Sequence, residues 1–257
     1  MECEAVKVYF VRHGESEWNK MNLFCGWVDV DLSEKGLQDA TSVSSEALIT
    51  EKVKFDMAFT SALKRADQTL RIILKNLHLD NIPVYSAWQL NERHYGNLTG
   101  FNKRQTADLY GEEKVQIWRR SYDVIPPPIT PKNPYYEVIR ANPKFKCIPE
   151  NEFPDCESLE TTLKRVVPFW ENVIVPEIKK RKNILIVLHG TSLRAIIKHI
   201  ENLNEDNIIK FNVPNSIPFF YEFDVNTVKI INKIKFLADE QVVANEMAKV
   251  ASIGKSN

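Results

Sequence analysis

The stretch that most constrains the fold is residues 183–188, NILIVL, which ends in five consecutive aliphatic residues. A strand with one face in water alternates apolar and polar residues, whereas an unbroken apolar run is typical of a strand covered on both faces. The run is far too short to span a membrane. It therefore predicts a strand inside a sheet that has helices packed on both sides.

Other apolar runs alternate with helical patterns along the chain. The remaining predicted strands are 7–11, 55–61, 82–88, PFFYEFD (218–224) and VKIINKIKFL (228–237). Helices are predicted at 33–47, after Ser61 to Leu77, at 103–121 with a break at Gly111, at 158–171, at 192–200 and from 239 onward. This alternation predicts an α/β fold, in which a mostly parallel sheet is flanked by helices on both faces.

No linker or change of composition divides the 257 residues. We therefore expect a single domain over 1–257, in which 239–257 forms a helical and then flexible tail. Residues 125–134, IPPPITPKNP, contain too many prolines for a helix or a central strand, so an extended surface loop is expected there.

The composition excludes several classes of partner. Lys and Arg together number 34, as do Asp and Glu, so the net charge is zero and bulk charge indicates neither a nucleic-acid nor a membrane partner. The four cysteines have no metal-ligand spacing, which predicts reduced thiols and no metal site. The first ten residues, MECEAVKVYF, lack a long apolar stretch, so no secretory signal and a cytoplasmic location are expected.

One sequence pattern occurs twice. VYFVRHGES (8–16) and LIVLHGTSL (185–193) both consist of an apolar strand, a His-Gly pair, a hydroxyl residue and the start of a helix. A single histidine at a strand end often only satisfies a hydrogen bond. The same pattern at two strand ends is harder to explain by packing alone. Because ligands bind beyond the carboxyl ends of parallel strands, we expect His13 and His189 to face one another if their strands are neighbours.

Cationic residues surround these strand ends in the sequence. They are Arg12, Arg65, Arg93, Lys103, Arg119, Arg120 and Arg194. A pocket of arginines around two histidines suits an anion, and guanidinium geometry matches phosphate or carboxylate. Glu92, in LNERHYG, is the candidate general acid–base, although pairing with an arginine is the alternative explanation for it.

Five segments together resemble a known family: VRHGESEWN, TSALKRA, NERHYGNLTG, IWRRSYD and LHGTSLR. They are similar to the histidine phosphatase superfamily and, within it, to the cofactor-dependent phosphoglycerate mutases, from about residue 6 to about residue 250. The resemblance implies a mixed, mostly parallel sheet, a homodimer and an enzyme that interconverts 3- and 2-phosphoglycerate. It also implies 2,3-bisphosphoglycerate as primer, and no metal.

The resemblance assigns a role to individual residues. It implies that His13 forms a phosphohistidine, that Arg12, Arg65 and His189 hold the transferring phosphoryl group, and that Glu92 is the general acid–base. The positions implied as ligands of the substrate's other groups are Asn19, Cys25, Gly26, Arg93, Tyr95, Lys103, Arg119, Arg120, Gly190 and Thr191.

Alternatives of three kinds stay open on the sequence. A bisphosphoglycerate synthase or phosphatase on the same site is one, a broad histidine phosphatase is the second, and a non-enzymatic paralogue is the third. Gly26 and Thr99 favour the mutase, because synthase-type relatives carry serine at the first position. The non-enzymatic reading fits poorly with a chain that keeps His13, Glu92 and His189.

Several positions depart from the family pattern. Thr191 replaces an asparagine, Gln89 replaces an arginine, which would remove one cation near the site, and FLADE (236–240) replaces Phe-Leu-Gly-Asp. Residues 213–218, VPNSIP, replace Pro-Thr-Gly; Asn215 tolerates left-handed geometry, whereas Ser216 tolerates it less well. Together these departures suggest reduced or altered activity.

Overall fold

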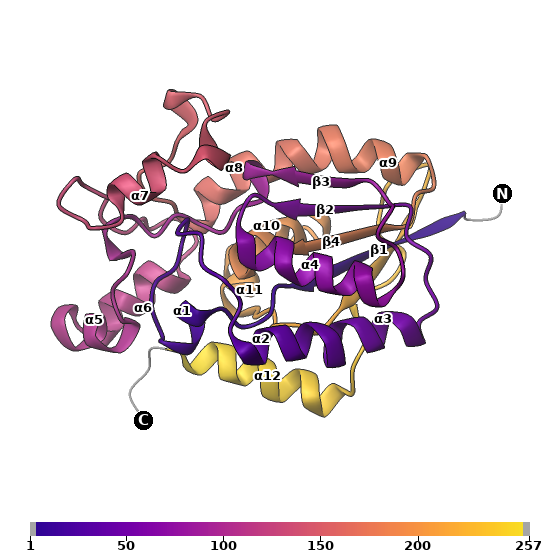
Figure 1. Cartoon of the computed structure of the whole chain (residues 1–257), viewed down its shortest axis with the longest axis horizontal. Coiled ribbons are helices and arrows are strands. Elements are labelled where there is room, and N and C mark those ends of the chain that lie inside the picture. Colours follow the sequence, from indigo (N-terminus) through magenta and orange to yellow (C-terminus); the bar gives the residue numbers. More distant parts are fainter. Residues whose placement is uncertain (1–3, 254–257) are drawn as a thin grey trace.

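The computed structural model describes residues 4–253 and contains one six-stranded sheet (Figure 1). Its order is β3-β2-β4-β1-β5-β6, and the bounds are β1 (Ala5–Arg12), β2 (Met57–Ser61), β3 (Val84–Ala87), β4 (Ile184–Leu188), β5 (Phe219–Asp224) and β6 (Lys235–Phe236). The first four strands in this order run parallel, and β5 and β6 are antiparallel to their neighbours. The predicted α/β fold with a mostly parallel sheet is confirmed.

Helices cover both faces of the sheet, as the apolar run of β4 predicted (Figure 1). Along β1, Val8 and Phe10 pack into one core with α8 (Leu159–Phe169) and α10 (Gly190–Ile200). Tyr9 and Val11 point to the opposite face and pack with α3 (Glu46–Thr50) and α4 (Lys64–Asn76). Successive side chains of a strand point to opposite faces, so β1 contributes to both cores.

The remaining helices are α1 (Glu17–Lys20), α2 (Glu34–Asp39), α5 (Lys103–Tyr110), α6 (Glu112–Arg120), α7 (Tyr136–Arg140), α9 (Val175–Lys179), α11 (Glu205–Lys210) and α12 (Glu240–Ser252). The helix predicted over 33–47 is divided by a π-helical segment, Ala40–Ser45. The break predicted at Gly111 is observed, because this residue has a φ of +90° between α5 and α6. Residues 125–134 contain neither helix nor strand, as predicted.

The strand predicted over VKIINKIKFL is wrong for most of its length. Only Lys235–Phe236 pairs as β6, besides an isolated bridge at Ile230. The Asp224 carboxylate accepts hydrogen bonds from the backbone amides of Asn226 and Thr227, and Val228 has a φ of +56°. A side chain that caps a turn in this way competes with strand pairing.

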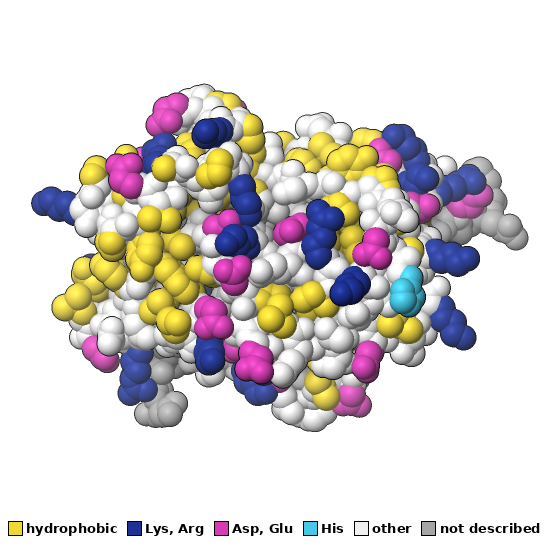
Figure 2. Space-filling view, viewed as in Figure 1, with side chains coloured by type: hydrophobic (Ala, Val, Ile, Leu, Met, Phe, Trp, Pro, Cys, Tyr) yellow, Lys and Arg dark blue, Asp and Glu magenta, His cyan; other side chains and the backbone are white. Residues whose placement is uncertain are grey.

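Figure 2 shows charges of both signs interspersed over one face, in keeping with the zero net charge. Within 4–253, no helix is long and apolar enough to cross a membrane. The tail is helical over α12, which lies near α2, because residues of both helices line one groove (Figure 1). The predicted flexible end at 254–257 lies outside the described residues.

The 215–216 turn differs from the expectation. Ser216, not Asn215, has the left-handed backbone, with a φ of +60°. The turn is anchored because the Ser216 amide donates to the Arg12 carbonyl over 2.9 Å and the Asn215 side chain donates to the His13 carbonyl over 2.7 Å. The Ser216 hydroxyl is buried without a hydrogen-bond partner in the described structure.

We predict that Ser216→Gly raises the free energy of unfolding by about 1 kcal/mol, because it removes left-handed strain and a buried unsatisfied hydroxyl. The greater freedom of glycine in the unfolded chain offsets part of this gain. Urea denaturation measures the difference. Ser216→Ala is the matched control, since it removes the hydroxyl and keeps the strain. A glycine variant no more stable than the original chain contradicts the prediction.

Candidate active site

The site is built on the pairing of two parallel strands. β1 and β4 are neighbours, with Arg12 opposite Leu188, and the His13 amide donates to the Leu188 carbonyl over 2.9 Å. The histidines that follow these strands therefore lie side by side. Their ring centroids are 4.9 Å apart and the rings are inclined by 62°.

The tautomer of His13 follows from its contact with the backbone. Its Nδ1 lies 2.6 Å from the Gly14 carbonyl oxygen, which can only accept, so Nδ1 carries the proton and Nε2 has a free lone pair. Burial lowers the pKa of His13 well below its usual value, and the charges of Arg65 and Arg12 lower it further. His13 is thus held neutral, with an unprotonated Nε2.

His189 has a different environment. Its Nε2 lies 2.7 Å from the Ser61 hydroxyl, and its Nδ1 is buried without a partner among the described residues. Burial, Arg65 and His13 lower its pKa well below the usual value. Ser61 was missed as a site residue. Its place at the end of the predicted strand 55–61 was a usable signal, and the structure pairs that strand with β4.

Most of the predicted residues line one pocket. They are Arg12, His13, Asn19, Cys25, Gly26, Arg65, Glu92, Tyr95, Lys103, Arg119, Arg120, Gly190 and Thr191. His189 lies against His13, outside this lining. Arg93 also lies outside it, where its guanidinium covers the Tyr95 ring at 4.6 Å and donates to the Arg119 carbonyl over 3.0 Å.

Carbonyl oxygens, not carboxylates, hold the key guanidinium groups. Arg65 donates to the carbonyls of Val28 and Gly26 over 3.1 and 2.8 Å. Arg12 donates to the Val213 carbonyl over 2.7 Å, while its buried Nε has no partner in the described structure. Neutral acceptors fix the geometry of a cation without cancelling its charge, so both charges remain available to an anion.

The charge of the pocket is one-sided. Its described lining contains the cations Arg12, Arg65, Lys103, Arg119, Arg120 and Arg194, and the only carboxylate there is that of Glu92. Burial and the nearby cations lower the pKa of Lys103 to about 7 and that of Arg194 to about 9. Burial is the larger cause, because it disfavours the charged form, and the neighbouring cations add to it.

Glu92 faces this pocket from a loop. Its carboxylate accepts the Arg93 amide over 2.7 Å and the Thr191 amide over 3.2 Å. The second contact comes from the first turn of α10, where the helix dipole favours negative charge. Thr191 therefore meets Glu92 through its backbone, a contact that the replacement of asparagine leaves intact.

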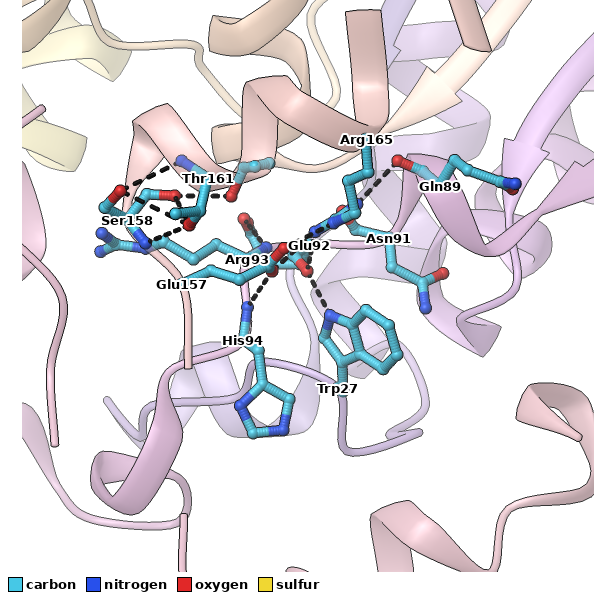
Figure 3. Close-up of polar contacts among 11 residues, drawn as sticks. Trp27, Gln89, Asn91, Glu92, Arg93, His94, Glu157, Ser158, Thr161 and Arg165 are labelled. Carbon is cyan, nitrogen blue, oxygen red and sulfur yellow. Dashed lines mark hydrogen bonds and ion pairs between the residues drawn. The ribbon is translucent and has the colours of Figure 1, made fainter. Parts of the chain in front are cut away.

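The expected effect of Gln89 is wrong. Its side chain points away from Glu92 (Figure 3), and it lines a groove with Trp88 and Glu152 rather than the pocket. An arginine at this position would therefore start from that groove and not from the pocket lining. Thr99 is buried and also lies outside the pocket lining.

The end of α12 covers part of the pocket, which the sequence did not predict. Arg120 donates to the Val250 carbonyl over 2.8 Å and to the Asn212 side chain over 2.7 Å, and Arg119 donates to the Ile253 carbonyl. Arg194, named from the sequence as one of the cations of the anion pocket, lines it. The lining residues not named from the sequence are Leu23, Asn212, Val213, Val250 and Ile253, and none of them carries a charge that would have singled it out.

Comparison with known proteins identifies relatives over most of the chain. Residues 8–224 match the histidine phosphatase superfamily (branch 1). The 2,3-bisphosphoglycerate-dependent phosphoglycerate mutase of Borreliella afzelii (strain PKo) is 47% identical over 97% of this chain and 98% of its own.

Solved structures share the fold. The phosphoglycerate mutase of Bacillus anthracis str. Sterne has a TM-score of 0.66 at 20% identity, over 99% of both chains. A mycobacterial glucosyl-3-phosphoglycerate phosphatase in complex with VO3 has a TM-score of 0.67 at 18% identity, over 90% of this chain and 98% of its own.

We predict that binding of sulfate to the pocket depends on Lys103 above pH 7. The pKa of Lys103 is about 7 in the free protein, so the amine is charged below pH 7 and neutral above it. Sulfate attracts the proton back, so binding at pH 8 takes up a proton and the affinity falls as the pH rises. Calorimetry in two buffers of different ionisation heat measures the uptake.

Lys103→Arg is the control, because arginine stays charged over this range. It is expected to lose the proton uptake at pH 8 and to bind sulfate with little dependence on pH. Equal uptake in both proteins contradicts the assignment to Lys103.

Proposed function

This chain belongs to branch 1 of the histidine phosphatase superfamily, and on that premise we propose that it acts as a 2,3-bisphosphoglycerate-dependent phosphoglycerate mutase, interconverting 3- and 2-phosphoglycerate. The observation that carries the proposal is the neutral His13 beside His189 in a pocket with six lining cations and one carboxylate. The 47% identical relative that carries this name supports it over nearly the whole length.

In this proposal, His13 is the phosphoryl carrier. Its Nε2 lone pair attacks phosphorus, a P–N bond forms, and the P–O bond to the departing alcohol breaks. Arg12, Arg65 and His189 surround the transferred group and stabilise the charge on its oxygens, which is the main task in phosphoryl transfer. The Gly14 carbonyl keeps the His13 ring oriented through Nδ1.

Glu92 is the proposed acid–base group, which gives a proton to the departing hydroxyl oxygen and takes one from the attacking hydroxyl. The substrate's carboxylate and remaining phosphate are assigned to the rest of the wall: Asn19, Tyr95, Lys103, Arg119, Arg120 and the backbone of Cys25, Gly26, Gly190 and Thr191. Arg93 is assigned to the same task from outside the lining. Arg93 acts here through the Arg119 carbonyl and the Tyr95 ring.

The pocket fits the implied primer. The buried Nε atom of Arg12 lacks a partner in the described structure, and the lining cations exceed the carboxylates, so the pocket has donors and positive charge to spare for several anionic groups. When bound, 2,3-bisphosphoglycerate supplies the phosphoryl group that His13 receives. Arg12, Arg65 and Lys103 would hold its charged groups.

Gly26 supports the mutase over the synthase alternative. This residue has a φ of +52°, and a Cβ here would lie 3.2 Å from the Tyr95 nitrogen. A serine is therefore strained in this backbone. The wall of the pocket depends on glycine at this position.

We also propose a cytoplasmic location and a homodimer. The free thiols of Cys25, Cys147 and Cys156 are in keeping with a reducing compartment. Light scattering of the purified protein tests the dimer.

His13→Ala is expected to abolish both phosphoenzyme formation from ³²P-labelled 2,3-bisphosphoglycerate and turnover of 3-phosphoglycerate, because the only proposed nucleophile is lost. The exposed histidine variant His78→Asn is the control and should retain both. Substantial mutase activity without His13 would sink the mechanism.

Glu92→Gln is expected to lower kcat by about 10²–10⁴-fold, since proton transfer is lost while the amide oxygen can still accept the Thr191 amide. KM should stay nearly unchanged, because substrate binding rests on the cations. Steady-state kinetics separate the two effects, with the exposed Glu152→Gln as control. Rapid hydrolysis of varied phosphomonoesters without mutase turnover would instead favour the broad phosphatase.

A further inference from the structure

Glu92 lies in a segment that has no regular backbone to hold it. The 3₁₀ turn Trp88–Leu90 ends just before it, and residues 91–95 belong to no helix or strand. Its carboxylate is contacted by the Arg93 and Thr191 amides, as described above. The position of the carboxylate therefore depends on what fixes the backbone of this segment.

Arg165, on α8, fixes that backbone by reaching its carbonyl groups (Figure 3). Its Nη1 donates to the carbonyls of Gln89 and Asn91 over 2.7 and 3.0 Å, and its Nη2 donates to the Glu92 carbonyl over 3.0 Å. A single guanidinium thus binds three carbonyls within four consecutive residues. Arg165 is absent from the pocket lining, so it does not meet a ligand there.

Glu157 holds Arg165 in this orientation and extends the contact to His94. Its Oε1 accepts from Arg165 Nε over 2.7 Å, and its Oε2 accepts from Arg165 Nη2 and from the His94 amide, both over 2.8 Å. The Glu157 amide in turn donates to the His94 carbonyl over 2.8 Å. The two side chains are only 9% and 4% exposed.

Trp27 completes the contacts on Glu92. Its Nε1 donates to the Glu92 carbonyl over 2.6 Å, and Arg165 lies over its ring at 5.6 Å (Figure 3). The Glu92 backbone is held from the α8 side by Arg165, while its carboxylate meets the first turn of α10. Both helices pack into one apolar core, so the two anchors of Glu92 are built on the same packed layer.

We propose that Arg165, held by Glu157, is a positioning residue that sets the Glu92 carboxylate for proton transfer. A buried ion pair adds little stability compared with apolar side chains of the same size, so its value here is geometric. The inference rests on the proposed function, in which Glu92 is the acid–base group. A misplacement of about 1 Å at such a group can cost about 10²-fold in rate.

Arg165→Met and Arg165→Lys test this in the full-length protein. The amount of phosphoenzyme formed from labelled 2,3-bisphosphoglycerate gives the number of competent active sites. The kcat is then expressed per labelled site. We expect kcat per site to fall about 10–100-fold in Arg165→Met and less in Arg165→Lys, with KM changed less than about threefold. A purely structural role would lower the number of labelled sites and leave kcat per site unchanged, which overturns the proposal.

A double-mutant cycle supplies the second criterion. In a Glu92→Gln background, Arg165→Met should cost little more, because the group it positions no longer transfers protons. Full additivity of the two losses contradicts positioning through Glu92. If Arg165→Met does not fold, the same double-mutant cycle is measured with Arg165→Lys.

The control is Arg140→Met, which removes an arginine with two carboxylate partners, Glu150 and Asp155, away from the pocket. It should leave kcat per site unchanged. If the original chain neither forms phosphoenzyme nor turns over 3-phosphoglycerate, the proposed function fails and this inference fails with it. Normal turnover with an unaffected Arg165→Met overturns this inference alone.

Discussion

The hydrogen-bonded pairing of β1 with β4 is the interaction on which the rest of the structure depends. It buries two apolar strands between two layers of helices, and its parallel sense makes both strands end at the same edge. At that edge His13 binds the Leu188 carbonyl, and His189 follows at once. The same pairing therefore supplies both the centre of the core and the centre of the pocket.

Around that centre, backbone groups hold some of the side chains in place, and side chains hold some of the backbone in place. Carbonyls fix Arg12 and Arg65, and amides fix the Glu92 carboxylate. Arg165 does the reverse and fixes three carbonyls of a loop. Loops without regular structure can hold reacting groups only when their polar groups are satisfied in this way.

Much of the fold and site could be predicted from the sequence. The apolar run at 183–188 gave the buried strand, and the repeated His-Gly pattern gave the two strand ends, because both depend on short local patterns. The family resemblance placed the cations. The expected loss of a cation at Gln89 was wrong because a departure from the family pattern does not tell on which side of a loop a side chain lies.

Other features had no local signal. Val250 and Ile253 contribute carbonyls to the pocket, and every residue has a carbonyl. Arg165 is one of several charged residues on an amphipathic helix, and only its distant partners distinguish it. Ser216 took the left-handed position because its amide and carbonyl are tied to Arg12 and Ser44, contacts between segments far apart in the chain.

Arg12 and Arg65, which are held by carbonyl oxygens and keep their charge, bear on the distance over which the pocket attracts an anion. The whole chain is neutral, so a distant anion meets no net field, yet the pocket keeps a concentrated positive charge. At physiological ionic strength that charge is screened beyond about 8 Å. An anion is therefore attracted only once it reaches the mouth of the pocket. The effect of ionic strength on its rate of binding comes from the charge of the pocket and not from the net charge of the chain.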